Sequence, residues 1–249
     1  MNASLTGTTA LVTGSTSGIG RATAEALAAL GAHVIVSGRN AARGESAAAE
    51  IRATGGKADF LAADLADSVS VRELAQKALR LGGGKVDVLV NNAGIFPFGA
   101  TEEMTEEQFD AVYAVNVKAP FFLAGALAPA MADHGSGAIV NITTIAAENG
   151  MSGMSLYGSS KAALVLLTKA WSSEYGPRGV RVNAVSPGPI LTEGTADSEE
   201  GLAQIAAGTP AGRIGTPQEI ASAVAFLVAP QASFIHGAIV AVDGGRTAV

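Results

Sequence analysis

The residues best suited to chemistry lie between positions 144 and 161, where Thr144, Tyr157 and Lys161 follow one another at spacings of thirteen and four. If Tyr157 lies at the start of a helix, Lys161 lies one turn further along on the same face. A phenol has an ordinary pKa of about 10, and a nearby ammonium group favours its anion. The pattern therefore predicts that Tyr157 is a general acid/base whose pKa Lys161 lowers. A tyrosine and a lysine four residues apart also occur in ordinary helices without any catalytic role. Other motifs in the sequence are therefore needed to distinguish a catalytic pair from an ordinary one.

A glycine-rich turn joins the first β-rich run to helical sequence, and it reads Thr13-Gly14-Ser15-Thr16-Ser17-Gly18-Ile19-Gly20. Glycine lets the backbone approach a pyrophosphate closely, and the start of a helix supplies free N–H groups and the positive end of a dipole. The spacing is Gly-x-x-x-Gly-x-Gly rather than Gly-x-Gly-x-x-Gly. Because this turn is the first strand-to-helix junction of an alternating series, we predict a dinucleotide site there and not an ordinary turn.

Composition excludes several classes of protein. The chain has 249 residues, 48% of them hydrophobic and 15% charged, which is enough for one sizeable core, and we expect a single domain over 1–249. The absence of cysteine excludes disulfides, thiolate metal sites and cysteine nucleophiles, and three scattered histidines indicate no metal site. A net charge of −6 argues against nucleic acid and anionic membrane surfaces. We see no signal peptide and no run of about 18 apolar residues, so we expect a cytoplasmic protein.

The order of elements predicts an α/β fold. Helical stretches from about Ile19 and about Ala41 begin a series in which helices alternate with seven short apolar runs, at 9–13, 33–37, 58–62, 86–90, 138–142, 180–185 and 238–242. Apolar strands joined by helices indicate a parallel sheet covered on both faces, which is a doubly wound, Rossmann-type architecture. Such sheets bind ligands beyond the carboxyl ends of their strands.

The glycine turn, Tyr157 and Lys161 together resemble the short-chain dehydrogenase/reductase family in its compact single-domain form, over essentially the whole chain. Within that family the chain is similar to 3-oxoacyl-[acyl-carrier-protein] reductases. Other motifs that carry the resemblance are Asn91-Asn92-Ala93-Gly94 after the fourth strand, Asn116 in the next helix, Pro187-Gly188-Pro189-Ile190-Leu191-Thr192 after the sixth strand, and Asp243-Gly244-Gly245 after the last.

The resemblance implies a role for each site residue. Tyr157 would exchange a proton with the carbonyl or alcohol oxygen, and Lys161 would lower its pKa and bind the nicotinamide ribose. Asn116 would hold a water molecule that links Lys161 to solvent, unless it only bonds backbone. Asp64 would lie near the adenine, unless it only caps the following helix. The implied cofactor-binding residues are Gly14, Ser15, Thr16, Ser17, Gly18, Ile19, Gly20, Arg39, Asp64, Leu65, Asn91, Ala93, Gly94, Tyr157, Lys161, Pro187, Gly188, Ile190 and Thr192.

One position departs from the family pattern, because a serine normally stands where this chain has Thr144. Threonine keeps a hydroxyl that donates to the substrate oxygen, but its β-branch restricts χ1 and adds a methyl group to the pocket. We expect activity to survive with a narrower choice of substrates. The alternatives are that Thr144 has no role in the chemistry and that Ser152 or Ser155 supplies the hydroxyl.

The second strand ends in Ser37-Gly38-Arg39-Asn40, and this end predicts the cofactor. An acidic residue near position 38 would accept a bond from the ribose 2′-hydroxyl of NAD, whereas Arg39 would attract the 2′-phosphate of NADP. We therefore expect NADP(H) to be preferred, with NAD(H) possible. Arg21 and Arg43 either add positive charge or are simply solvated surface residues.

The substrate pocket is expected to come from 191–213 and from the neighbourhood of Phe96, Ala147, Met151 and Met154. No lysine or arginine occurs between Leu191 and Gly212, so we expect a small neutral carbonyl or alcohol substrate. The segment 192–210 is expected to act as a lid. Docking of an acidic carrier protein is in doubt, since 119–140 holds no lysine or arginine and Arg178 is the lone basic candidate.

The leading hypothesis is thus an NADP(H)-dependent ketone reductase or secondary-alcohol dehydrogenase. The alternatives are a 3-oxoacyl reductase, an NAD-dependent sugar or polyol dehydrogenase, and a dinucleotide-binding sensor without turnover. The apolar helical stretches at 119–132 and 157–175, with the pairing seen in relatives, suggest a homotetramer.

Overall fold

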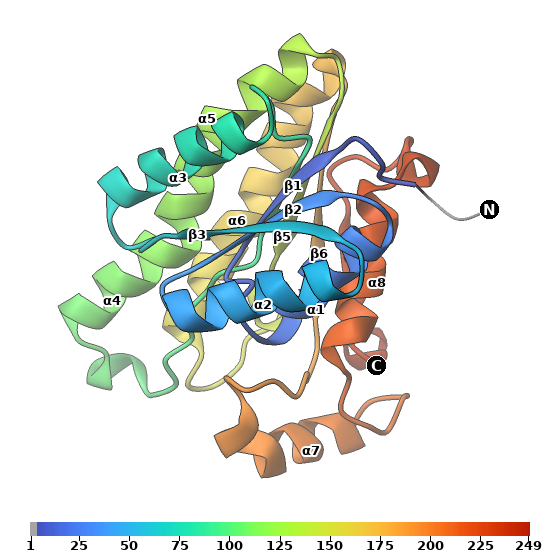
Figure 1. Cartoon of the computed structure of the whole chain (residues 1–249). Coiled ribbons are helices and arrows are strands. Elements are labelled where there is room, and N and C mark those ends of the chain that lie inside the picture. Colours follow the sequence, from blue (N-terminus) through green and yellow to red (C-terminus); the bar gives the residue numbers. More distant parts are fainter. Residues whose placement is uncertain (1–3) are drawn as a thin grey trace.

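The computed structural model describes residues 4–249, and all seven strands run parallel in one sheet in the order β3-β2-β1-β4-β5-β6-β7 (Figure 1). The predicted fold class, an α/β doubly wound sheet in a single domain, is confirmed. The strands are β1 Thr9–Thr13, β2 His33–Gly38, β3 Lys57–Ala62, β4 Val88–Asn91, β5 Gly137–Ile142, β6 Val180–Pro187 and β7 Ile239–Val242. The helices are α1 Gly18–Ala29, α2 Ala41–Ala53, α3 Ser68–Leu81, α4 Glu106–Tyr113, α5 Ala119–Asp133, α6 Ser155–Tyr175, α7 Glu199–Ala207 and α8 Pro217–Val228.

Helices cover both faces of the sheet, so the strands are buried on two sides. Helices α1, α2 and α8 pack on one face, and α3, α5 and α6 pack on the other. Successive residues of β1 point to opposite faces: Ala10 and Val12 join the first core, and Leu11 joins the second. This two-sided burial explains why the strands read as continuous apolar runs without alternation.

The strand order reverses between β1 and β4. From β1 the chain proceeds outward to β2 and β3, then returns to β4 and proceeds outward on the other side. Connections that leave in opposite directions open a crevice at the carboxyl ends of these two strands. The glycine turn follows β1, and the other predicted motifs follow β4, β5 and β6, so the sheet gathers them at one edge.

Two details differ from the sequence-based expectations. The fourth strand begins at Val88 rather than at residue 86, because the Asp87 carboxylate accepts bonds from Thr9 N at 2.7 Å and Lys85 Nζ at 2.6 Å and closes the start of the strand. The helical run Glu106–Asp133 is also long and apolar enough, by length and composition, to cross a membrane. In the fold, Leu123, Leu127 and other residues of α5 are buried in the core beside α3, as expected for a core helix.

Candidate active site

Tyr157 lies in the first turn of α6, which begins at Ser155. The helix is held close to the short turn Ile145–Ala147, since a Cβ on Gly158 would lie 2.6 Å from the Ala146 carbonyl oxygen. Thr144 opens that turn, and its Oγ1 accepts a bond from Ala146 N at 3.3 Å. This close approach, which the glycine permits, brings the Thr144 hydroxyl to the Tyr157 phenol.

Burial raises the pKa of Tyr157 to about 12, and the hydrogen bond with the Thr144 side chain opposes this effect. The sequence predicted a net lowering of the Tyr157 pKa by Lys161, whereas the net shift in this structure is upward and is set by burial and Thr144. The physical reason is that removal of the phenol from water disfavours its anion more than its neighbours favour it.

The Lys161 ammonium group is directed to the backbone. Its Nζ donates to the Ile142 carbonyl oxygen at 2.8 Å, and burial lowers the Lys161 pKa to about 8. Gly94 leaves the space beside it open, since a Cβ there would lie 3.2 Å from Lys161 Nζ and 3.4 Å from Asn116 Oδ1. The structure thus brings Lys161 and Asn116 together at the loop that follows β4.

Asn116 is fully buried in a single π-helical turn, Ala114–Lys118, that joins α4 to α5. Its side chain accepts from Ile95 N at 2.9 Å and donates to Ile95 O at 2.9 Å and to Ser160 Oγ at 3.0 Å. Ser160 Oγ in turn donates to the Tyr157 carbonyl oxygen at 2.7 Å. Asn116 therefore does bond backbone, as one hypothesis held. Ser160, which sequence reasoning missed, connects it to the first turn of α6.

Within residues 4–249, neither of the alternative hydroxyl groups is hydrogen-bonded to the Tyr157 side chain, whose hydrogen-bond partner is Thr144. Ser155 Oγ pairs with Thr101 Oγ1 at 3.0 Å, and Ser152 is exposed. Among the three candidates, Thr144 is the hydroxyl that the fold places beside the phenol.

The glycine turn packs very closely against the loop that follows β4. Gly14 has φ +61°, and a Cβ on it would lie 2.8 Å from the Ala93 Cα. A Cβ on Gly20 would fall on the Gly14 carbonyl oxygen. Asn92 supports the turn by donating its Nδ2 to the Thr13 and Gly14 carbonyl oxygens at 2.8 and 3.0 Å. Only glycine satisfies this packing.

Two serines of the turn have different surroundings. Ser15 is fully buried and links the turn to β2 by hydrogen bonds. Its Oγ donates to Val12 O at 2.7 Å and accepts from Ser37 N, in β2, at 3.0 Å. Ser17 precedes α1 and makes no side-chain cap. One N–H of the first helical turn is bound instead by a residue that sequence reasoning missed: Gly18 N donates to Glu193 Oε2 at 2.9 Å.

Asn91 ends β4 in the crevice and is almost fully buried. Its Nδ2 donates to Asn141 Oδ1 at 2.8 Å, whereas its Oδ1 is one of two buried side-chain polar atoms without a partner among the described residues. An unpaired buried oxygen is costly unless a ligand or a water molecule satisfies it.

The hypothesis that Asp64 caps the next helix is excluded. The cap of α3 is Asp67, whose carboxylate accepts from Val69 N and Ser70 N, both at 3.0 Å. Asp64 Oδ1 instead accepts from Ala66 N at 3.1 Å. Leu65 belongs to the core beside it.

The end of β2 leaves no room for a side chain at position 38, since a Cβ on Gly38 would lie 2.7 Å from the Thr16 methyl carbon. Arg39 is exposed at this end. Arg21 pairs with Glu25 at 2.9 Å and with Glu50, so its charge is already partly balanced.

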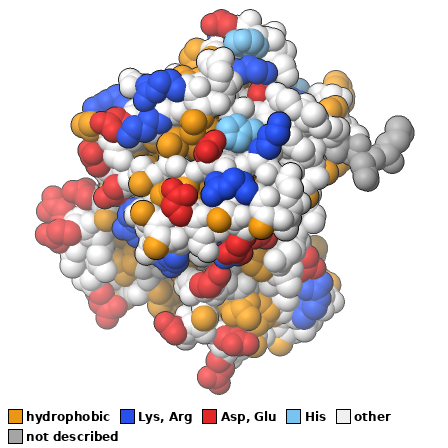
Figure 2. Space-filling model, in the orientation of Figure 1, with side chains coloured by type: hydrophobic (Ala, Val, Ile, Leu, Met, Phe, Trp, Pro, Cys, Tyr) orange, Lys and Arg blue, Asp and Glu red, His pale blue; other side chains and the backbone are white. Residues whose placement is uncertain are grey.

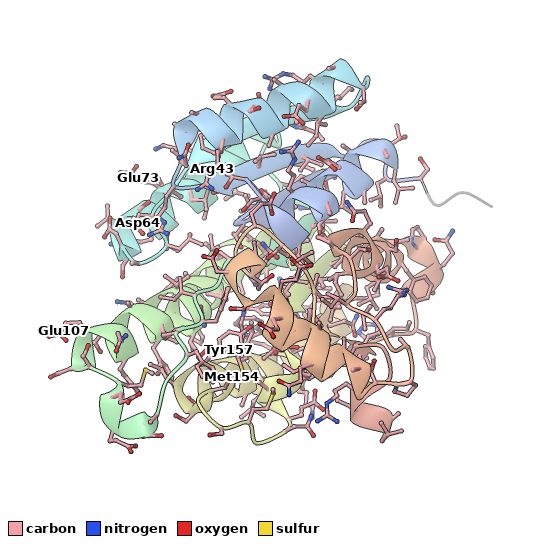
Figure 3. The ribbon with its side chains drawn as sticks, turned by 90° about the horizontal axis from the view of Figure 1, so that it is seen from below. Arg43, Asp64, Glu73, Glu107, Met154 and Tyr157 are labelled. Atoms are coloured by element: carbon pink, nitrogen blue, oxygen red, sulfur yellow. The ribbon has the colours of Figure 1, made fainter. Side chains whose placement is uncertain are left out.

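The segment after β6 lies against the glycine turn. The Thr192 side chain lies 3.3 Å from the Cβ position of Gly18, and Ile190 is buried and forms an isolated bridge with Gly215. Pro187 ends β6, and Gly188 packs on the Asp243 backbone. In Figure 3, Tyr157 and Met154 lie on one side of the molecule, well apart from Arg43 and Asp64.

These residues fit a dinucleotide. The glycine crossing leaves a backbone cradle that a Cβ would fill, the start of α1 offers N–H groups, and the Asn91 oxygen lacks a donor. The Tyr157 phenol is hydrogen-bonded to the Thr144 hydroxyl, and the Lys161 ammonium lies beside Asn116 at the loop after β4. Within residues 4–249, no three His, Asp or Glu side chains come close enough to hold a metal ion.

Comparisons with known proteins agree with this geometry. Residues 14–247 match the family model described as enoyl-(acyl carrier protein) reductase. A solved structure of a short chain dehydrogenase/reductase family protein is 48% identical, with TM-score 0.92 and 100% of both chains covered. A putative NAD(P)-dependent gluconate 5-dehydrogenase from Beutenbergia cavernae, solved with bound NADP, is 42% identical, with TM-score 0.94 and 99% of both chains covered. A 3-oxoacyl-[acyl-carrier-protein] reductase of Thermotoga maritima is 36% identical over 97% of this chain and 98% of that protein.

Proposed function

This chain belongs to the short-chain dehydrogenase/reductase family, and we infer from that membership and from the site that it is an oxidoreductase that prefers NADP(H) and acts on a small neutral carbonyl compound or secondary alcohol. The observation that carries this proposal is the meeting of Thr144, Tyr157, Lys161 and Asn116 beside the glycine cradle. A bound nicotinamide dinucleotide supplies or accepts the hydride.

The protein residues transfer the proton and orient the substrate oxygen. The Tyr157 hydroxyl donates a proton to the carbonyl oxygen during reduction and accepts one during oxidation. The Thr144 hydroxyl orients the same oxygen and stabilises the phenolate through a hydrogen bond. Lys161 keeps a positive charge within the site at neutral pH, because its pKa of about 8 leaves most of it protonated.

The other implied cofactor contacts are part of the proposal. Gly14, Gly18 and Gly20 would lie against the pyrophosphate, and the Asn91 oxygen would accept a bond from the dinucleotide. Arg39 beside the closed position 38 supports a preference for the 2′-phosphate of NADP(H), with NAD(H) possible.

The test is oxidation of NADPH and NADH in the presence of ketones, 3-oxoacyl thioesters and ketoses. We expect turnover of neutral ketones with NADPH in preference to NADH. Tyr157→Phe should abolish turnover and leave NADPH binding within about twofold, because the ring is kept and only the acid is lost. Equal turnover by this variant would exclude the proposed role. Cofactor binding without turnover of any substrate would favour a sensor instead.

A 3-oxoacyl-[acyl-carrier-protein] reductase is the alternative suggested by the Thermotoga maritima relative. The surface gives it little support, since the lone basic candidate, Arg178, is paired with Asp133 at 2.6 Å. Turnover of a carrier-bound thioester at least about tenfold better than of the free thioester would decide for this alternative.

We further propose a homotetramer. Three apolar side chains are exposed on α5 and α6, with Phe121 at 49%, Phe122 at 44% and Leu166 at 67%, and they line a hollow of about 740 Å³. Phe234 is exposed at 99% near the start of β7 and supports a second contact. Leu166→Glu should reduce the mass measured by light scattering, because a charge would be buried in the contact.

Finally, we propose that residues 1–249 form one NAD(P)-binding oxidoreductase domain and that the protein works in the cytoplasm, where a reduced dinucleotide is available. Limited proteolysis should give no stable half-sized fragment, and cell fractionation should recover the protein with cytoplasmic markers.

A further inference from the structure

Three segments of the chain meet over Tyr157 and form the rim of the site: residues 94–113 after β4, 144–160 after β5, and 188–212 after β6. The first two are joined by a bond from Gly99 N to Gly153 O at 3.0 Å. The third reaches the first where a Cβ on Gly194 would lie 3.7 Å from the Phe96 ring. We call these three stretches the rim segments. Tyr157 belongs to the second segment and packs against Phe96 of the first, so a substrate bound at Tyr157 lies beside these segments.

Two phenylalanine rings of the first rim segment lie against the second segment, at Tyr157 and at Gly153. Phe96 packs edge-on against Tyr157 with ring centroids 5.9 Å apart, and it is 45% exposed. Phe98 is 75% exposed, and its ring lies over Gly153, where a Cβ would come within 2.6 Å of it. Met154 lies near Tyr157 at the same side of the molecule (Figure 3). Exposed rings and a thioether beside a reactive hydroxyl form an apolar platform suited to a flat apolar group.

The rim segments are also acidic, and their carboxylates are exposed. The rim segments contain no lysine, arginine or histidine and ten carboxylates: Glu102, Glu103, Glu106, Glu107, Asp110, Glu148, Glu193, Asp197, Glu199 and Glu200. These are ten of the 22 acidic residues of the chain. In Figure 2 acidic side chains gather over the start of α4 and over α7.

One cation, Lys118, lines the same hollow as Asp110, whereas the other cations are paired, buried or placed elsewhere. Arg213, directly after the third rim segment, is paired with Glu219 at 2.6 Å, and Lys161 is buried against the Ile142 carbonyl. Arg21 is paired with Glu25 and Glu50. Exposed Arg39 lies at the end of β2, on the cofactor side. The rim segments therefore carry only negative charges, one of which, Glu193, also reaches the glycine turn, whereas the exposed cation Arg39 lies at the cofactor end of β2.

We propose that this site selects carbonyl substrates that carry an aromatic group and no negative charge, with Phe96 and Phe98 binding the ring and the acidic rim rejecting anions. This inference deepens the proposed function and rests on it. A carboxylate or phosphate on the substrate meets a repulsive field at the entrance and finds no guanidinium to pair with. An ammonium group on the substrate is attracted by the same field and by the faces of the phenylalanine rings.

The experiment compares three ketones that share one scaffold: 4′-methylacetophenone, 4-acetylbenzoate and 4-(aminomethyl)acetophenone, which are neutral, anionic and cationic. We expect kcat/KM for the neutral and cationic ketones to exceed that for the anion by at least about tenfold at low ionic strength. The difference should shrink as salt is added, because salt screens exposed charges. Binding of the same ketones to the Tyr157→Phe protein with NADPH, followed by cofactor fluorescence, should give the same order without turnover.

Phe98→Ala should lower kcat/KM for 4′-methylacetophenone by about tenfold and leave that for acetone within about twofold. Phe226→Ala is the matched control, since it removes a half-exposed ring on α8, outside the rim segments, and should change neither value. Equal or better turnover of 4-acetylbenzoate overturns the inference, and so does turnover confined to ketoses or 3-oxoacyl thioesters. Both results leave the proposed oxidoreductase function standing. Only the absence of turnover with every carbonyl compound would count against that function.

Discussion

Replacement of Lys161 by methionine should stabilise the protein without cofactor while it abolishes turnover. The Lys161 ammonium is buried and has one hydrogen bond, from Nζ to the Ile142 carbonyl oxygen. The fall of its pKa from 10.5 to about 8 corresponds to about 3 kcal/mol of unfavourable free energy for the charged form in the folded protein. Methionine fills a similar volume without a charge, so that cost is removed. The loss of the hydrogen bond to Ile142 reduces the gain in stability by about 1 kcal/mol. We expect Lys161→Met to raise the free energy of unfolding by about 2 kcal/mol at neutral pH.

The pH dependence follows from the same pKa. Because the folded pKa of Lys161 lies below its unfolded value, the unfolded chain binds more protons than the folded protein between about pH 8 and about pH 10.5. The contribution of Lys161 to stability therefore rises with pH in that window, and the advantage of Lys161→Met should shrink. Tyr157 acts in the opposite direction only above about pH 10, since its folded pKa is raised to about 12.

The assay is urea unfolding of both proteins at equal concentration, without cofactor, at about pH 7 and about pH 9.5. Lys169→Met is the matched control, because Lys169 is exposed on the same helix, and it should change stability by less than about 0.5 kcal/mol. A Lys161→Met protein that is less stable than the parent at pH 7, or a difference that grows with pH, would refute the reasoning.

Three further predictions concern other parts of the structure. Gly20→Ala should weaken NADPH binding at least about tenfold with little change in circular dichroism, because its methyl group falls on the Gly14 carbonyl oxygen and displaces the turn. Glu193→Gln should tighten NADPH binding about two- to fivefold in a fluorescence titration, since the neutral amide competes more weakly than the carboxylate for Gly18 N and no longer repels the pyrophosphate. Arg181→Met should lower the free energy of unfolding by about 3 kcal/mol in urea, because the guanidinium donates to four carbonyl oxygens at the end of α8 and just beyond it.

Matched controls exist for each variant. Gly125→Ala adds a methyl group where no atom lies within 4 Å and should leave NADPH binding unchanged. Asp197→Asn removes a carboxylate from the same loop as Glu193 without touching the glycine turn. Arg178→Met removes an exposed arginine and should cost less than about 1 kcal/mol. Weaker cofactor binding by Glu193→Gln, or an Arg181→Met protein as stable as its control, would contradict the corresponding argument.

The sequence by itself determined the class of fold and the place of the site. Apolar runs of strand length between helical stretches require a parallel sheet buried on both faces, and the motifs that follow β1, β4, β5 and β6 then meet at one edge. The sequence also predicted the role of the glycines in the turn. Gly14 and Gly18 have positive φ, and Gly20 lies too close to the Gly14 carbonyl oxygen for a side chain, so these positions favour glycine.

Only the tertiary structure decided how the individual groups are used. The Tyr157 pKa depends on how deeply the phenol is buried, a quantity that helical spacing does not contain, and so its net shift is upward where the spacing predicted a lowering. Ser160 and Glu193 carried no signal in the sequence, because their partners, Asn116 and Gly18, lie 44 and 175 residues away. Asp67 rather than Asp64 caps α3 because the loop after β3 places it at the start of the helix. Spacing along the chain fixes which side chains share an element, whereas burial and partners from distant segments fix their chemistry.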